Sequence, residues 1–302
     1  MSVSKTNNRR IAKNTLLLYV RMMFTMLVSI YTSRVILDVL GIDDYGLYQT
    51  VGGIVGFLAF INGALSAGSS RFITFALGEN NENKLKETFS TTFLIHLALA
   101  FVVVILAETI GSWFLYYKLQ IAQERMDAAV YVFHLSVITA FLNLVQTPFS
   151  AVIIAREKMA IYAYVSIFEV SLKLLIVYLL LLGNLDKLVL YATLLCILQI
   201  GLIWFYLFYC RYKFHEVRFS VSCNPSVLRK LLGYSGWNLL GSISVALNDQ
   251  GILILLNMFF NPAVVASRAV SLQVKMATEQ FVNNFRTAVN PQIIKKYAAH
   301  DE

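Results

Sequence analysis

The chain consists of long apolar stretches separated by short polar connections. A helix that crosses a bilayer needs about 20 mostly apolar residues, and eight stretches reach that length. They cover residues 14–39, 47–72, 88–113, 128–155, 161–183, 185–209, 233–260 and 263–292. The predicted fold class is therefore an all-α integral membrane protein with about eight transmembrane helices.

Basic residues alternate between successive connections. The N-terminus carries Lys5, Arg9, Arg10 and Lys13, whereas the first turn carries acidic residues and no base. The longest connection, residues 210–232, is strongly basic, and the turn that follows it has no base. Because Lys and Arg collect in cytoplasmic loops, this pattern predicts that the N- and C-termini are both cytoplasmic.

Composition narrows the class of protein. Apolar residues make up 58% of the chain and charged residues 14%, with a net charge of +8. Soluble domains average about 45–50% apolar and about 25% charged residues, so a soluble enzyme, a nucleic-acid-binding protein and a disordered chain are excluded. The three cysteines have no metal-ligand spacing. We expect no metal, no cofactor and no nucleic-acid partner.

Two segments, Gly46–Gly78 and Ala266–Ala298, align without gaps and are separated by six spans. An even separation gives both copies the same orientation, which is typical of a parallel repeat around the membrane normal. The repeat divides the chain into a six-helix N-terminal lobe (1–212), a basic cytoplasmic linker (213–232) and the first helix pair of a second lobe (233–302). A complete repeat would have about twelve spans, so either this chain is truncated or the repeat interpretation is wrong.

The last predicted span carries four charged residues on one helix face. Arg268, Lys275, Glu279 and Arg286 follow one another at intervals of seven, four and seven residues, which places them in one stripe. A charge at the bilayer centre costs at least about 2.5–3.5 kcal/mol, and a basic stripe that faces a watery cavity suits an anionic headgroup. Alternatively, Arg268 and Arg286 extend to opposite interfaces and Lys275 pairs with Glu279.

Three other spans carry charged candidates. Arg21 either lines a cavity or extends to the cytoplasm. Glu169 and Lys173 can neutralise each other, as an interhelical contact, a cavity wall or an ion-coupling site. Asp249 either pairs with a base of the last span or titrates with a coupling proton. We predict Arg21, Lys173, Arg268, Lys275 and Arg286 as substrate-binding residues of the cavity, and Glu169, Asp249 and Glu279 as residues for ion coupling or charge pairing.

Several motifs resemble the polysaccharide transporter family, the O-antigen and exopolysaccharide flippase branch of the multidrug/oligosaccharidyl-lipid/polysaccharide superfamily. They are RVILDVLGIDDYGLY at 34–48, Arg71-Phe72-Ile73, LLNMFF at 255–260 and NPQIIKKYA at 290–298. The resemblance implies a two-lobed, twelve-helix transporter of the bacterial inner membrane. Such a protein flips undecaprenyl-pyrophosphate-linked oligosaccharide for lipopolysaccharide or other polysaccharide biosynthesis, alongside other polysaccharide assembly proteins.

Other functions remain as alternatives. A cation-coupled multidrug exporter of the same superfamily would favour an acidic cavity, whereas the charge excess inside these spans is basic. A membrane-embedded enzyme would need catalytic residues on a sizeable outer loop, but the outer loops here are short and carry no paired carboxylates beyond Asp43 and Asp44. An inactive truncated product is the third alternative.

Overall fold

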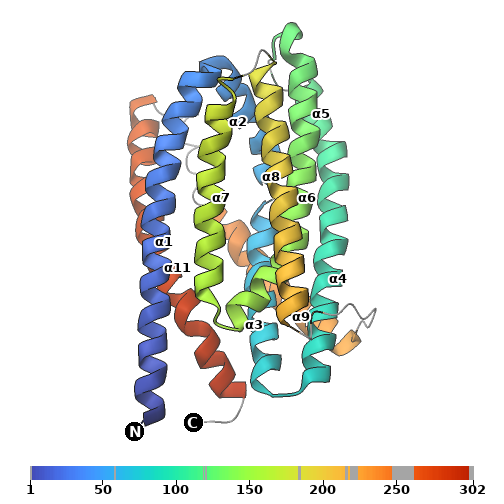
Figure 1. The fold of residues 1–302 in the computed structure, drawn as a ribbon. Coiled ribbons are helices and arrows are strands. Elements are labelled where there is room, and N and C mark those ends of the chain that lie inside the picture. Colours follow the sequence, from blue (N-terminus) through green and yellow to red (C-terminus); the bar gives the residue numbers. More distant parts are fainter. Residues whose placement is uncertain are drawn as a thin grey trace.

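The computed structural model is a bundle of long helices that run roughly parallel to one another (Figure 1). It describes residues 2–57, 59–117, 119, 121–182, 185–214, 217, 224–246 and 262–298. Helix α1 begins, and helix α11 ends, at the same end of the bundle (Figure 1). We call this end the inner end and the opposite end the outer end.

Every regular element among the described residues is a helix, which confirms the predicted fold class. The helices are α1 (Ser2–Leu40), α2 (Ile42–Phe57), α3 (Ala59–Gly78), α4 (Glu82–Leu106), η1 (Ala107–Gly111), α5 (Ser112–Tyr117), η2 (Gln123–Arg125), α6 (Met126–Ala155), α7 (Met159–Leu179), α8 (Lys187–Lys213), α9 (Pro225–Ala246) and α11 (Pro262–Ala298). The η1 segment is a π-helical turn that joins α4 to α5.

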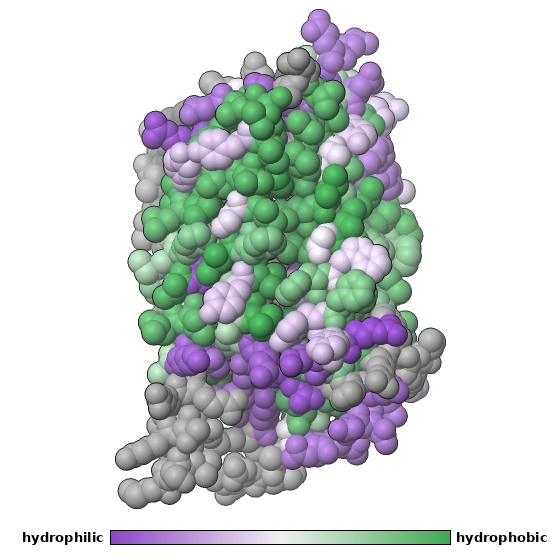
Figure 2. Space-filling model, viewed as in Figure 1, coloured by the Kyte–Doolittle hydropathy of each residue, from purple (hydrophilic) through white to green (hydrophobic). Residues whose placement is uncertain are grey.

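Five helical segments among the described residues are long and apolar enough to cross a membrane. They are Ala12–Leu40, Glu82–Tyr117, Gln123–Ala155, Met159–Leu179 and Lys187–Lys213, and each overlaps a predicted span. Figure 2 shows a broad apolar band between hydrophilic ends on the face that α7 and α8 present. This apolar band is the surface that lipid tails would cover. The helices beneath it bond their backbone N–H and C=O groups internally, as a hydrocarbon environment requires.

The other three predicted spans differ from the helices of the structure in their bounds or in how much of them is described. The single span predicted at 47–72 is shared between α2 and α3, in a stretch whose glycines lower helix propensity. The span at 233–260 is described as α9 up to Ala246, and its remainder lies outside the described residues. The span at 263–292 lies in α11.

Local signals explain where several helices begin. Asn81 caps α4 by accepting a hydrogen bond from the Lys84 N–H at 3.1 Å, and Asn224 accepts from the Ser226 N–H at 3.0 Å. Pro225 then opens α9, a position where proline loses no helical hydrogen bond. Helix α9 therefore begins inside the stretch predicted as the linker. Gly41, with φ of +82°, forms the tight turn between α1 and α2.

Helix α6 lies at the centre of the bundle and packs against α8, α4, α3 and α2, while α1 packs on α7. The aromatic rings of Phe89 and Phe149 stack edge to face in the core, with centroids 5.7 Å apart, and both side chains are fully buried. Within the first six predicted spans the helices therefore form one packed body, on which α9 and α11 rest through α3 and α1.

At the outer end, Arg125 joins three helices. Its guanidinium bonds the carboxylate of Asp44 in α2 at 2.5 Å and that of Asp186 at the start of α8. Partial burial raises the pKa of the Asp186 carboxyl, but hydrogen bonds from Arg125 and from the N–H groups of Val189 and Leu188 outweigh burial and hold that pKa below its ordinary value. The guanidinium thus ties the outer ends of α2, α6 and α8 together.

At the inner end, Glu157 connects α11 to the turn between α6 and α7. Its carboxylate accepts hydrogen bonds from Lys295 Nζ and Gln292 Nε2, both at 3.0 Å, and its side chain is only 6% exposed. Gly78 lies so close to α11 that an added Cβ would be 2.7 Å from the Cβ of Ala298. We call the contact of Glu157 with Gln292 and Lys295 the inner latch.

Replacing Arg125 with alanine should lower the free energy of unfolding by about 1 kcal/mol, because partly exposed ion pairs contribute about that much. The stabilisation that the Asp186 carboxylate provides is complete above the ordinary carboxyl pKa of about 4. It is lost as the pH falls through the lowered pKa that Asp186 has in the folded protein. The difference between the parent protein and Arg125→Ala should therefore be constant from pH 5 to 7 and shrink below about pH 4. Thermal unfolding in detergent, followed by circular dichroism, measures this difference; a constant difference down to pH 3 would contradict the assignment.

Candidate functional site

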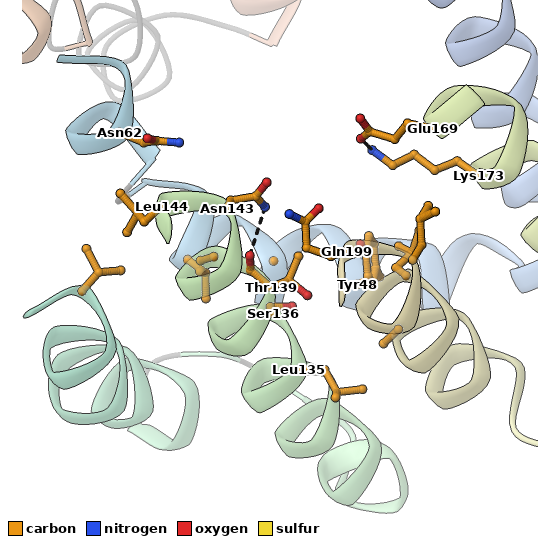
Figure 3. Close-up of a pocket in the computed structure, with 17 residues that line it drawn as sticks. Tyr48, Asn62, Leu135, Ser136, Thr139, Asn143, Leu144, Glu169, Lys173 and Gln199 are labelled. Atoms are coloured by element: carbon orange, nitrogen blue, oxygen red, sulfur yellow. Dashed lines mark hydrogen bonds and ion pairs between the residues drawn. The ribbon is translucent and has the colours of Figure 1, made fainter. Parts of the chain in front are cut away.

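A cavity of about 380 Å³ lies inside the bundle, among α2, α3, α4, α6, α7 and α8. Figure 3 shows Asn143 and Gln199 between Asn62 on one side and the Glu169–Lys173 pair on the other. Its polar lining consists of Tyr48, Asn62, Ser136, Thr139, Asn143, Glu169, Lys173 and Gln199. We call this space the polar cavity.

Glu169 and Lys173 are one helical turn apart on α7. The Lys173 Nζ donates to Glu169 Oε1 at 2.6 Å, and both side chains keep partial exposure, 43% for Lys173 and 30% for Glu169. The spacing that predicted a shared face is therefore reproduced, and the pair forms part of the cavity wall (Figure 3). Because the two charges neutralise each other, they add no net charge to the polar cavity.

The uncharged amides of the polar cavity were missed by reasoning from the sequence. Asn143 donates to the backbone oxygen of Thr139 at 3.0 Å, and Gln199 donates to Gln146 Oε1 at 2.8 Å. Asn62 accepts a hydrogen bond from Thr147 at 2.8 Å. The signal in the sequence that could have indicated these residues was the presence of neutral amides inside apolar spans. A search for charged residues alone does not detect them.

A second polar region lies where α3, α9 and α11 meet. The guanidinium of Arg71 in α3 stands 4.7 Å from the centre of the Tyr234 ring in α9, and Arg286 in α11 is near enough to act on the same tyrosine hydroxyl. Both arginine side chains are exposed, and no carboxylate within the described ranges pairs with them. We call Arg71, Tyr234 and Arg286 the cationic cluster.

Two further donors in α1 and α11 have no hydrogen-bond partner within the described part of the chain. Arg21 stacks over Tyr162 with its guanidinium carbon 4.7 Å from the ring centre, and its buried Nε donates to nothing there. Asn284, only 7% exposed, has an equally unpartnered Nδ2. A buried donor without a partner costs about 1–3 kcal/mol, which makes both groups available to a ligand with acceptor oxygens.

The structure separates the remaining predicted residues. Lys275 and Glu279 lie within 3.7 Å of each other one turn apart on α11, which matches the local pairing alternative. No described residue of α11 lines the polar cavity. The side chain of Arg268 and the whole of Asp249 lie outside the described residues.

Comparison with known proteins places the chain in a family. A sequence model of the MatE family matches residues 11–179, which is more than half of the chain, so the chain belongs to the MatE family. None of the curated proteins matches the sequence.

Solved transporters share the fold. A MATE structure in the straight conformation has a TM-score of 0.78 at 14% identity, over 98% of this chain and 66% of that one. An outward-facing multidrug resistance MATE family transporter of the MOP superfamily has a TM-score of 0.78 at 15% identity, over 98% of this chain and 66% of that one. A MOP superfamily transporter from Pyrococcus furiosus Vc1 has a TM-score of 0.73 at 14% identity, over 96% of this chain and 66% of that one. That protein is described as having a binding pocket of reverse polarity, which suggests a different function.

The chain is thus a multi-pass integral membrane protein of the MatE family, with the fold of solved MATE transporters. It spans 66% of the length of these solved transporters.

Neutralising one member of the Glu169–Lys173 pair should destabilise the protein more than neutralising both. Glu169→Gln leaves an ammonium without its carboxylate, and we expect a loss of about 1 kcal/mol, since the pair is partly exposed. Lys173→Gln should cost about as much for the same reason, and the double variant Glu169→Gln/Lys173→Gln should recover most of either loss. Melting temperatures of the four proteins in one detergent measure the coupling; additive effects of the single changes would show that the pair contributes nothing.

Proposed function

We propose that the protein flips a lipid-linked oligosaccharide, carried on undecaprenyl pyrophosphate, across the bacterial cytoplasmic membrane during polysaccharide or lipopolysaccharide biosynthesis. The observation that carries this proposal is the cationic cluster: Arg71 stacks over Tyr234, the charge of Arg286 on another helix acts on the same tyrosine, and neither arginine pairs with a carboxylate among the described residues. An uncompensated positive site between transmembrane helices suits an anionic headgroup. The motifs at 34–48 and 290–298 support the polysaccharide branch of the family.

The chemistry of the cluster matches a pyrophosphate. Guanidinium groups donate paired N–H bonds that fit phosphate oxygens. Arg21 offers a third guanidinium on α1. Of the predicted cavity residues, Arg21 and Arg286 hold the headgroup directly, whereas Arg268, about 27 Å along α11 from Arg286, meets the substrate at another depth of the cleft. Lys173 and Lys275 act with their partners Glu169 and Glu279, while Asp249 serves pairing or ion coupling.

We further propose the two-lobe division at 1–212, 213–232 and 233–302. A twofold axis along the membrane normal would map α1 onto α9 and α3 onto α11. Such an axis requires matched contacts, and α1 does pack on α11 while α3 packs on α9. The last residues of the aligned segments, Gly78 and Ala298, also meet, as equivalent positions beside an axis do.

In this proposal the sugar crosses through a wet cleft while the lipid tail stays in the bilayer, and rocking of the lobes exposes the cleft to one side and then the other. The inner end is cytoplasmic, in agreement with the basic connections at that end. The inner latch joins the two lobes there, so it must break whenever the cleft opens toward the cytoplasm.

A multidrug exporter is the second candidate, because an outward-facing multidrug resistance transporter shares the fold. The only specific support in the described cavity is the Glu169 carboxylate, and Lys173 already neutralises it. Cationic drugs would meet the arginines of the cationic cluster with repulsion, so the lipid-linked glycan is the better match.

Charge reversal in the cationic cluster should abolish glycan export. In a host that depends on this gene, Arg71→Glu and Arg286→Glu should each reduce surface polymer at least tenfold and leave undecaprenyl-pyrophosphate glycan on the cytoplasmic leaflet, because phosphate then meets a carboxylate. Lipid extraction and surface-polymer blotting measure both quantities.

Lys213→Glu, an exposed base at the inner end of α8, is the matched control and should leave export unchanged. Reversal of Lys275 should have a smaller effect, since that lysine is close to Glu279. Normal export by both Arg71→Glu and Arg286→Glu would refute the assignment. Raised sensitivity to cationic drugs without glycan accumulation would favour the exporter.

Loosening the inner latch should open the cytoplasmic side of the cleft. Ala288 in α11 is fully buried against Leu18 and Met159, so a cysteine placed there reports on separation of α11 from α1 and α7. In a cysteine-free background, Glu157→Gln should raise maleimide labelling of Ala288→Cys several-fold from the cytoplasmic side. Glu79→Gln, which breaks a pair with Lys84 inside one lobe, is the control; equal labelling in both variants would rule out a gating role.

A further inference from the structure

An apolar groove of about 580 Å³ runs between α7 and α8. Tyr164, Val165, Phe168 and Leu172 form one wall, and Leu198, Gly201, Leu202 and Phe205 form the other. The α7 wall is two helical turns long, about 12 Å at 1.5 Å per residue. Apart from the Tyr164 hydroxyl, every lining side chain is a hydrocarbon, so the groove, which we call the tail groove, complements an alkyl or isoprenoid chain.

Gly201 creates the open space in this groove. No heavy atom lies within 4 Å of the position that a Cβ would take at Gly201, and two aromatic residues of the same lining, Phe168 and Phe205, are 59% and 45% exposed. A glycine among such residues leaves a hollow where other residues would fill the seam. The hollow can therefore be filled by substitution without a clash.

The tail groove and the polar cavity share one wall. Leu198 lines both spaces. On α7, Phe168 and Leu172 face the groove, while their neighbours Glu169 and Lys173 face the cavity. On α8, Gln199 lines the cavity directly after Leu198. The hydrocarbon space and the polar space thus adjoin at Leu198.

The polar cavity suits an uncharged head. Its two charges pair with each other at 2.6 Å, which leaves amides and hydroxyls such as those of Asn143, Gln199 and Ser136 to face a ligand (Figure 3). Amides and hydroxyls both donate and accept hydrogen bonds, as sugar hydroxyls do. A volume of about 380 Å³ lies within the usual range of small-ligand pockets, about 300–1,000 Å³.

We propose that the α7–α8 seam is a binding site for a glycolipid, with an uncharged sugar head in the polar cavity and a hydrocarbon tail in the tail groove. The ligand reaches the seam sideways from the bilayer. This site is separate from the cationic cluster and does not depend on the identity of the transported lipid.

The tail half of the proposal is tested by photolabelling. The full chain, in phosphatidylcholine nanodiscs, is irradiated with dodecyl maltoside that carries a diazirine in its chain, and labelled peptides are mapped by mass spectrometry. We expect label on α7 and α8, and at least a fivefold loss in Gly201→Leu, which fills the groove. Gly241→Leu on α9, where an added Cβ also meets nothing within 4 Å, should label normally. Equal labelling of both variants, or label spread evenly over all lipid-facing helices, overturns the proposal.

The head half needs a second probe. A diazirine-bearing dodecanol has the same chain without the sugar. Asn143→Leu combined with Gln199→Leu should reduce labelling by the maltoside at least threefold and leave labelling by the alcohol unchanged. If the double variant affects neither probe, or both equally, the sugar does not occupy the polar cavity. Since the assay involves no transport, its result is independent of whether Arg71 variants lose glycan export.

Discussion

The low polarity of the bilayer is the constraint on which this structure depends. A charge placed in hydrocarbon costs several kcal/mol, so each charged group inside the bundle must find a partner or face water. Glu169 and Lys173 neutralise each other, and Lys275 lies one turn from Glu279. In the cationic cluster, Arg71 and Arg286 are exposed and have no carboxylate partner in the described ranges, so by this rule they face water or an anion.

Charged groups with partners stabilise the fold, whereas charged groups without a carboxylate partner in the described ranges can bind a ligand. The Arg125 guanidinium forms ion pairs with two carboxylates at the outer end. The Glu157 carboxylate accepts hydrogen bonds from two donors at the inner end. Both contacts tie helices together. Arg71 and Arg286 have no carboxylate partner in the described ranges where α3 meets α9 and α11, which is where the proposed anionic cargo would need them.

The two ends of the bundle also differ in what they connect. Arg125 joins α2, α6 and α8, which all belong to the first six spans, so it stiffens one body. The inner latch instead joins the α6–α7 turn to α11, across the boundary between the two proposed lobes. A rocking transporter needs rigid lobes and breakable contacts between them, and the two clusters are distributed in that way.

The sequence by itself determined the helical membrane fold, because apolar length and the alternation of basic connections are local properties. It also predicted the Glu169–Lys173 contact, since helical spacing alone places those residues on one face. Only the tertiary structure decided which helices meet. Arg71 had no predicted role until α9 brought Tyr234 against it, and Asn143 and Gln199 entered the polar cavity only through packing of α6 on α8. Contacts between distant helices depend on packing, and no local periodicity in one chain encodes them.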